Sequence, residues 1–187
     1  MAKAVLISIR PEWVEKILAG EKTIEVKKTR PNMGTPFKCY IYCTQSGVAL
    51  GAWGKHGKVI GEFTCDRIYK IDKDSTDFLF KAGGLSVYKQ AAEEKCGLCV
   101  AMTDDELHGY LGHCQGYGWH ISNLKIYDAP KKLGEFWRDC LEYSELSTNC
   151  WSCENVCGDG DETNCNTDGR LYLHRPPQSW CYVEELK

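Results

Sequence analysis

Three ionisable side chains near the start of the chain, Lys22, Glu25 and Lys27, have the spacing of a binding or catalytic site. Residues 23–27 (TIEVK) alternate polar and apolar side chains, which predicts a short strand with one apolar face. Thr23, Glu25 and Lys27 then share the polar face, about 7 Å from one to the next, and Lys22 stands at its mouth. A carboxylate between two ammonium groups predicts a surface for a polar ligand.

The same pattern is also typical of a solvated strand face that carries a cross-strand ion pair. Spacing alone favours that simpler interpretation. A lysine in such a cluster acts as a base only if desolvation lowers its pKa. The choice between the two interpretations therefore depends on the rest of the chain.

Several predicted elements position this strand. A buried strand at residues 4–9 leads into a helix that begins at Pro11, and Trp13/Ile17 and Val14/Leu18 give that helix one apolar face before Gly20 ends it. Thr103 and Glu106 form a capping box for a second helix that runs to residue 111. Further strands are predicted at 37–44, at 59–71 with a bend or bulge at Gly61, at 118–127 ending before Pro130, and at 179–185.

Several non-local strands with a few short helices predict one α+β domain over residues 1–187, built as a small, partly open mixed β-barrel with flanking helices. At about residues 140–170 the aliphatic residues almost vanish, and Cys, Asn, Asp, Gly and Thr dominate. That segment lacks the means to build its own core. We therefore expect a Cys-rich insertion held by something else.

Zinc is the candidate for holding the insertion. The chain has 12 cysteines, and Cys150 and Cys153 have the C-x2-C spacing of a zinc knuckle. Cys165 follows, and the fourth ligand is either Cys140, which we favour, or Cys157. The predicted zinc is structural, with a closed coordination shell; the alternative is a set of free thiols. Another C-x2-C pair, Cys96 and Cys99, fits ordinary cysteines at a helix edge better than a redox pair.

Charge is distributed unevenly along the chain. The net charge is −3, but residues 1–60 carry ten Lys and Arg against four Asp and Glu, while residues 61–187 carry 13 against 22. A basic front on an acidic body fits one anionic ligand bound in one place better than sliding along a polyanion. No apolar run approaches the roughly 20 residues that a membrane helix needs, so we expect a soluble, cytoplasmic protein without a membrane partner.

Four segments resemble a known family. Residues 6–11 (LISIRP), 17–28 (ILAGEKTIEVKK), 118–127 (GWHISNLKIY) and 176–184 (PPQSWCYVE) are similar to segments of ASCH domains from phages and prophages, a family of the PUA-like superfamily of small β-barrels. The family motif G-x-K-x-x-E-x-[RK] is matched by Gly20, Lys22, Glu25 and Lys27. With this resemblance, the binding-site interpretation of these residues is favoured over the solvated strand face.

The resemblance implies a basic cleft that binds RNA or a modified nucleotide. Lys22 would meet a phosphate or a base carbonyl, Glu25 would accept hydrogen bonds from a base's exocyclic N–H groups or orient Lys22, and Lys27 would supply a second cationic contact. Trp53, in a glycine-rich loop at residues 46–58, is the candidate stacking platform. Trp119 fits a core position better.

The resemblance also implies two alternatives. Some small ASCH proteins are amidohydrolases that remove the acetyl group of N4-acetylcytidine with a Lys, a Thr and a Glu. Lys22 matches that lysine, but Glu25 occupies the threonine position, and Thr23 has no matching role. The other alternative is a protein-interaction module of phage origin. For the nucleotide-binding hypothesis, we expect Lys22→Ala to weaken binding without lowering thermal stability.

Overall fold

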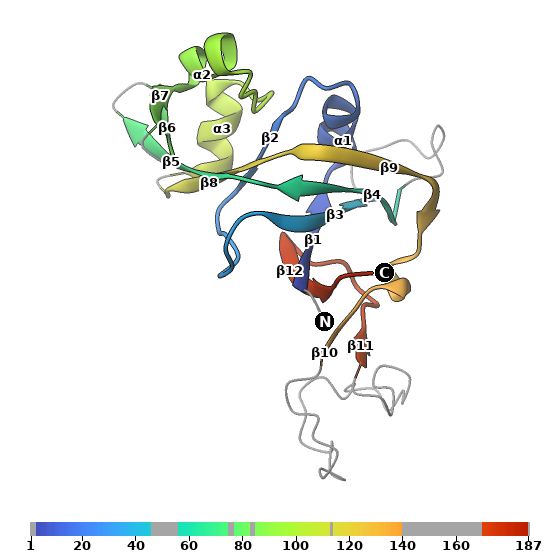
Figure 1. Cartoon of the computed structure of the whole chain (residues 1–187). Coiled ribbons are helices and arrows are strands. Elements are labelled where there is room, and N and C mark those ends of the chain that lie inside the picture. Colours follow the sequence, from blue (N-terminus) through green and yellow to red (C-terminus); the bar gives the residue numbers. More distant parts are fainter. Residues whose placement is uncertain are drawn as a thin grey trace.

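The computed structural model describes residues 3–45, 56–74, 77–82, 85–112, 114–139 and 170–186. Strands dominate, and short helices flank them (Figure 1). The elements are β1 (Lys3–Ile9), α1 (Pro11–Leu18), β2 (Ile24–Lys27), β3 (Phe37–Cys43), β4 (Lys58–Cys65), β5 (Ile68–Asp74), β6 (Asp77–Ala82), β7 (Leu85–Tyr88), α2 (Lys89–Cys96), α3 (Asp104–Leu111), β8 (Gly116–His120), β9 (Ser122–Lys131), the 3-10 helix η1 (Leu133–Glu135), β10 (Trp137–Asp139), β11 (Arg170–Tyr172) and β12 (Trp180–Glu184).

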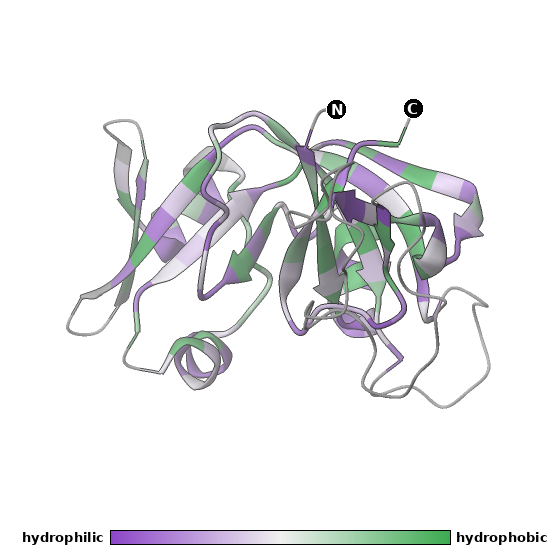
Figure 2. Cartoon of the chain, turned by 90° about the horizontal axis from the view of Figure 1, so that it is seen from below, coloured by the Kyte–Doolittle hydropathy of each residue, from purple (hydrophilic) through white to green (hydrophobic). Residues whose placement is uncertain are grey.

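The first five-stranded sheet has the order β12-β1-β3-β4-β9. Its strands pair antiparallel except β1 and β3, which run parallel. Side chains of β1 are buried on both faces: Val5 and Ile7 belong to one apolar cluster and Leu6 to another. This explains the continuous apolar run of β1, because a central strand covered on both sides has no polar face. Hydrophobic and hydrophilic residues alternate along several strands (Figure 2).

The second five-stranded sheet has the order β2-β8-β5-β6-β7 and is antiparallel throughout. Ile24 and Val26 of β2 pack in a cluster with Leu107 and Leu111 of α3. The capping box expected for this helix is confirmed, because the Thr103 hydroxyl accepts a hydrogen bond from the helix backbone and a Glu106 carboxylate oxygen accepts one from the Thr103 N–H. The apolar face of β2 thus fixes one helix beside the predicted site.

Two connections carry the chain from one sheet to the other. β4 ends in the first sheet and β5 begins in the second after only two residues, and β8 passes into β9 across Ile121. The two crossings lie together, since His120 donates its backbone N–H to the Arg67 carbonyl and its Nδ1 lies 2.7 Å from Asp66 Oδ1. The single strands predicted at 59–71 and 118–127 are therefore wrong: each is two strands that belong to different sheets.

Pro130 does not end the last of these strands, because β9 continues to Lys131. β9 lies at the edge of its sheet, where the missing proline N–H breaks no ladder. The bend expected at Gly61 is confirmed, since the register between β4 and β9 shifts there. A Cβ atom at Gly61 would lie 2.5 Å from the Lys125 carbonyl oxygen.

The α+β class is confirmed, but the described residues form two joined sheets and no closed barrel. A further two-stranded pairing joins β10 to β11, with Asp139 opposite Arg170. This pairing brings together the two positions between which the Cys-rich segment lies. In the part of the chain that the structure describes, no helix has the length and apolar character needed to span a membrane.

Candidate functional site

Lys22, Glu25 and Lys27 follow directly from the turn that ends α1. Gly20 adopts a positive φ of 75°, which closes the helix, and β2 begins four residues later. Within β2 the apolar side chains face α3, so Glu25 and Lys27 take the opposite face. The solvated-face interpretation is wrong, because Lys22, Glu25 and Lys27 are only 2%, 5% and 5% exposed.

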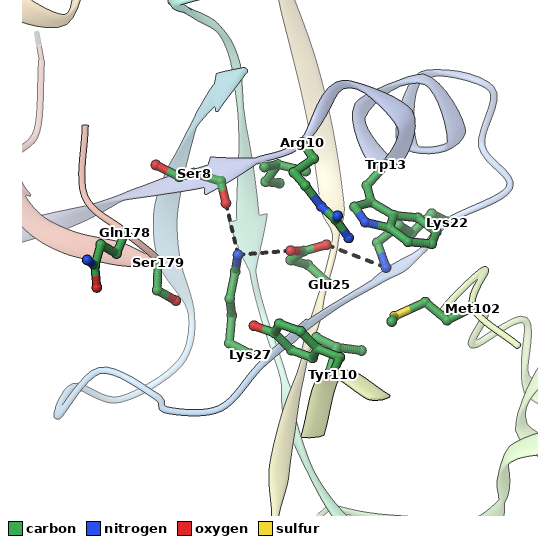
Figure 3. Close-up of a pocket in the computed structure, with 12 residues that line it drawn as sticks. Ser8, Arg10, Trp13, Lys22, Glu25, Lys27, Met102, Tyr110, Gln178 and Ser179 are labelled. Carbon is green, nitrogen blue, oxygen red and sulfur yellow. Dashed lines mark hydrogen bonds and ion pairs between the residues drawn. The ribbon is translucent and has the colours of Figure 1, made fainter. Parts of the chain in front are cut away.

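Glu25 lies between the two lysines. Its Oε1 is 3.0 Å from Lys27 Nζ and its Oε2 is 3.4 Å from Lys22 Nζ. Lys22 donates to the Val100 carbonyl at 2.7 Å, and Lys27 donates to the Ser8 carbonyl at 2.9 Å. Glu25 Oε2 is buried and has no hydrogen bond of acceptable geometry from any described residue. Figure 3 shows the carboxylate at the centre of this cluster.

Burial and charge act in opposite directions on these groups. Desolvation would raise the pKa of Glu25, but the charges of Lys27 and Lys22 outweigh it and hold that pKa below its usual value. For Lys22, desolvation is the larger effect and lowers the pKa of the ammonium group although Glu25 opposes it. Glu25 is thus held ionised, and Lys22 is the lysine that releases its proton more readily than usual.

A pocket of about 180 Å³ opens over the cluster. Trp13 of α1 and Tyr110 of α3 form opposite walls, with Arg10 beside Trp13 (Figure 3). Lys22 Nζ also lies 5.3 Å from the centre of the Trp13 ring. The lining residues are Ser8, Ile9, Arg10, Trp13, Lys22, Glu25, Val26, Lys27, Met102, Tyr110, Gln178 and Ser179.

Residues 97–102, here called the strap, lie beside this pocket, and Met102 lines it. Thr23 Oγ1 accepts from the Cys99 N–H and donates to the Gly97 carbonyl, both at 2.8 Å. Lys16 donates to the Ala101 carbonyl at 2.9 Å. Thr23 therefore does not share the pocket with Glu25 as the alternation predicts, because its hydroxyl is bonded to the strap.

Comparison with known proteins gives structural neighbours only. No family model matches the chain, and no curated protein matches it. Similar solved structures include the ASCH protein of Zymomonas mobilis, which is 18% identical over 70% of this chain and 73% of that chain, with a TM-score of 0.48. A variant of that protein with a tyrosine-to-phenylalanine substitution is 17% identical over 71% and 77% of the two chains, with a TM-score of 0.47. These neighbours carry the name of the family that the sequence resembles; the phage-type subtype stays a prediction.

Several predicted site residues lie outside the described residues. These are Trp53 and the candidate zinc ligands Cys140, Cys150, Cys153, Cys157 and Cys165. Within the described ranges, no group of three or more His, Cys, Asp or Glu side chains is arranged to hold a metal. The zinc site therefore stays a prediction.

Two other expectations are confirmed. Trp119 is fully buried in the core, with its ring 5.7 Å from that of Phe37 and 5.8 Å from that of Trp180. Cys96 is the last residue of α2, and Gly97 follows it in a left-handed conformation. The position of Cys96 at a helix edge is therefore confirmed, and the assignment of Cys96 and Cys99 as ordinary cysteines stays a prediction.

Sequence reasoning missed the pocket walls. Tyr110, Met102 and Gln178 are distant in sequence from the motif, and only the packing of α3, the strap and the C-terminal segment brings them to it. Trp13 carried a signal, because it is a large aromatic residue seven residues before Gly20, where the family motif begins, but its helical spacing assigns it to the core. Arg10 is part of the LISIRP segment, and nothing in its sequence pattern indicates that it lines the pocket.

Proposed function

We propose that this chain binds a nucleotide, free or within RNA, with the edge of its base against Glu25. The observation that carries the proposal is the buried carboxylate itself, at the inner end of an open pocket: Glu25 Oε2 lies 3.4 Å from Lys22 Nζ and lacks a hydrogen bond of acceptable geometry from the described residues. A buried acceptor without a donor is costly. A ligand that supplies an N–H group would remove that cost.

Glu25 and Lys27 together present a hydrogen-bond acceptor and a hydrogen-bond donor side by side. An ammonium group has three hydrogens, and Lys27 uses one on the Ser8 carbonyl and one on Glu25. One hydrogen remains without an acceptor among the described residues. A carboxylate acceptor beside an ammonium donor complements a base that has an amino group next to a carbonyl or ring nitrogen, and carboxylates accept from the exocyclic amine of cytosine in known complexes.

The pocket walls suit a flat ligand. Trp13 and Tyr110 offer aromatic rings on either side of the carboxylate (Figure 3), and unpaired bases stack on such rings. The pocket volume of about 180 Å³ is below the range of drug-sized sites, which begins at roughly 300 Å³. A single small base fits better than a larger cofactor. The match to the ASCH motif at Gly20, Lys22, Glu25 and Lys27 supports the same ligand class.

Calorimetric titration with two nucleosides tests the proposal. Cytidine and uridine differ in that an amino group replaces a carbonyl, so Glu25 should favour cytidine by about tenfold or more. Tyr110→Leu should weaken cytidine binding, while Tyr88→Leu, an exposed tyrosine away from the pocket, should not. Equal affinity for both nucleosides, or equal effects of the two variants, would contradict the proposal.

Hydrolysis of an acylated nucleoside is a second candidate, favoured by the lowered pKa of Lys22. A neutral amine at this position would take a proton from water as the water adds to the acetyl carbon. It would pass that proton to the N4 nitrogen as the C–N bond breaks, so that N4-acetylcytidine and water give cytidine and acetic acid. Thr23 does not serve as a nucleophile, since its hydroxyl is bonded to the strap. Chromatography of N4-acetylcytidine incubated with wild type and Lys22→Met tests this: cytidine must appear with the wild type alone.

A further inference from the structure

Arg10 occupies the mouth of the pocket, where β1 ends and α1 begins. It has an extended backbone (φ −71°, ψ 149°), and Pro11 fixes the start of the helix directly after it. The guanidinium lines the pocket on the Trp13 side (Figure 3). Its side chain is 57% exposed, in contrast to Lys22 at 1% and Lys27 at 7%. Arg10 is thus the pocket cation that solvent reaches.

The partners of Arg10 leave most of its donors available. Its Nε lies 3.1 Å from Glu12 Oε1, and its guanidinium carbon lies 5.9 Å from the centre of the Trp13 ring. No described residue accepts a hydrogen bond from its terminal nitrogens. Lys22 and Lys27, by comparison, each donate to a backbone carbonyl and share Glu25. The inner cations are compensated, whereas Arg10 retains a fork of N–H groups suited to an anion.

Some groups around Arg10 favour binding of an anion there, and others oppose it. α1 begins beside it with no side chain capping the helix, and the N-terminal end of a helix favours negative charge. Lys16 adds a cation, with its Nζ 4.7 Å from the Trp13 ring centre. Glu12 and Glu106 are the acidic groups that interact with Arg10. An anion must displace the Glu12 contact, which is an exposed ion pair and therefore weak.

We propose that Arg10 binds the phosphate of the nucleotide whose base lies against Glu25. The ligand is then a phosphate-bearing nucleotide, free or within a chain, and not a nucleoside. This inference rests on the proposed function, because it takes the base position from Glu25. It divides the pocket into an inner end that recognises the base through hydrogen bonds and a mouth that recognises the anion through charge.

Calorimetric titration of the full chain with cytidine and with cytidine 5′-monophosphate tests the inference. The monophosphate should bind about tenfold more tightly than cytidine, as expected for one charge-assisted contact at an exposed site. Arg10→Ala should reduce this ratio to about one, and Arg10→Lys should restore part of the ratio. Arg67→Ala, an exposed arginine that does not line the pocket, is the matched control and should keep the full ratio.

The possible failures are distinct. If wild type binds cytidine and its monophosphate equally, or if Arg10→Ala keeps the tenfold ratio, the phosphate assignment is wrong while base binding stands. If neither ligand binds, the proposed function fails and this inference fails with it. Higher salt should reduce the ratio for wild type, because an exposed charge contact is screened; a ratio that does not depend on salt contradicts a role for Arg10 charge.

Discussion

Glu25 and Lys27 alternate on one face of β2, and Glu25 Oε1 and Lys27 Nζ lie 3.0 Å apart inside the protein. Lys22 completes the cluster from the turn before the strand. The three groups together carry one net positive charge away from solvent. Burying such a cluster opposes folding unless every charge is paired. Its position at the inner end of a pocket therefore fits a group kept for binding.

Removing the carboxylate should destabilise the protein strongly. Glu25→Gln leaves two buried ammonium groups without a counter-ion, and breaking a buried ion pair in this way costs about 3–5 kcal/mol. Urea unfolding followed by circular dichroism measures the loss. Glu12→Gln is the matched control, since that glutamate is exposed, and its effect should stay within about 0.5 kcal/mol. Similar values for the two variants would show that the cluster does not contribute to folding.

Acid should remove the contribution of Glu25 to the free energy of unfolding. Its pKa in the folded protein lies below the usual value of 4.5, so the unfolded chain binds the proton more readily. The stabilisation is fully present above pH 4.5 and is lost as the pH falls through the folded-state pKa. The difference in unfolding free energy between wild type and Glu25→Gln should therefore narrow from about pH 6 to about pH 3. A difference that is constant with pH would mean that the pKa of Glu25 is the same in the folded and the unfolded protein, and would contradict its lowered pKa.

Thr23 should act on the strap and not on the ligand. Thr23→Val keeps the shape but leaves the Cys99 N–H without its acceptor, which costs about 1–3 kcal/mol. Amide exchange of Cys99 should accelerate in the variant. Thr64→Val is the control, because the Thr64 hydroxyl makes no hydrogen bond to the described residues. It should change the free energy of unfolding by no more than about 0.5 kcal/mol and leave the exchange rate of the Cys99 amide unchanged. Unchanged exchange at Cys99 would contradict the role given to Thr23.

Gly61 should tolerate no side chain. A Cβ there would lie 2.5 Å from the Lys125 carbonyl oxygen, so Gly61→Ala should destabilise by about 1–3 kcal/mol through forced movement of β9. Gly109→Ala is the contrasting variant: nothing lies within 4 Å of its added carbon, and alanine favours the helix by up to about 1 kcal/mol. The midpoint temperature of thermal unfolding should fall for Gly61→Ala and rise for Gly109→Ala. A shift of both midpoints in the same direction would contradict the close approach of β9 to Gly61.

Zinc in the Cys-rich segment stays a prediction with its own test. Elemental analysis of the purified protein should find about one zinc per chain, as expected for four thiolate ligands. Replacing Cys150 and Cys153 together by serine should abolish it, while replacing Cys114, an exposed free cysteine of the described region, should not. Comparison of Cys140→Ser with Cys157→Ser identifies the fourth ligand. Metal-free wild-type protein would contradict the site.

Local patterns were sufficient to predict the residues of the inner site. Lys22, Glu25 and Lys27 lie within six residues of one another, so strand alternation and a short motif bring them together without knowledge of the fold. Their burial was not predictable, because the groups that cover and satisfy them, Ser8 and Val100, come from other elements. For the same reason, Lys22→Ala should lower thermal stability as well as binding, since Lys22 donates a buried hydrogen bond to the Val100 carbonyl.

The topology was predicted less well, because the signals that separate strands were missing. The chain passes from β4 to β5 through Asp66 and Arg67, with no proline or glycine to mark the crossing. The same holds for Ile121 between β8 and β9. β6, β7 and α2 lack a sustained apolar period, and packing against the second sheet determines them more than local propensity does.

A nucleotide site around Glu25 can be detected by titrating the isotope-labelled full chain with cytidine 5′-monophosphate and following assigned ¹H–¹⁵N resonances. We expect saturable shifts concentrated at the pocket, including the Trp13 indole and the backbone amides of Val26, Met102 and Ser179. Residues of the far edge strand β7 should not move. Absence of saturable shifts, or shifts centred away from the pocket, would contradict the nucleotide site.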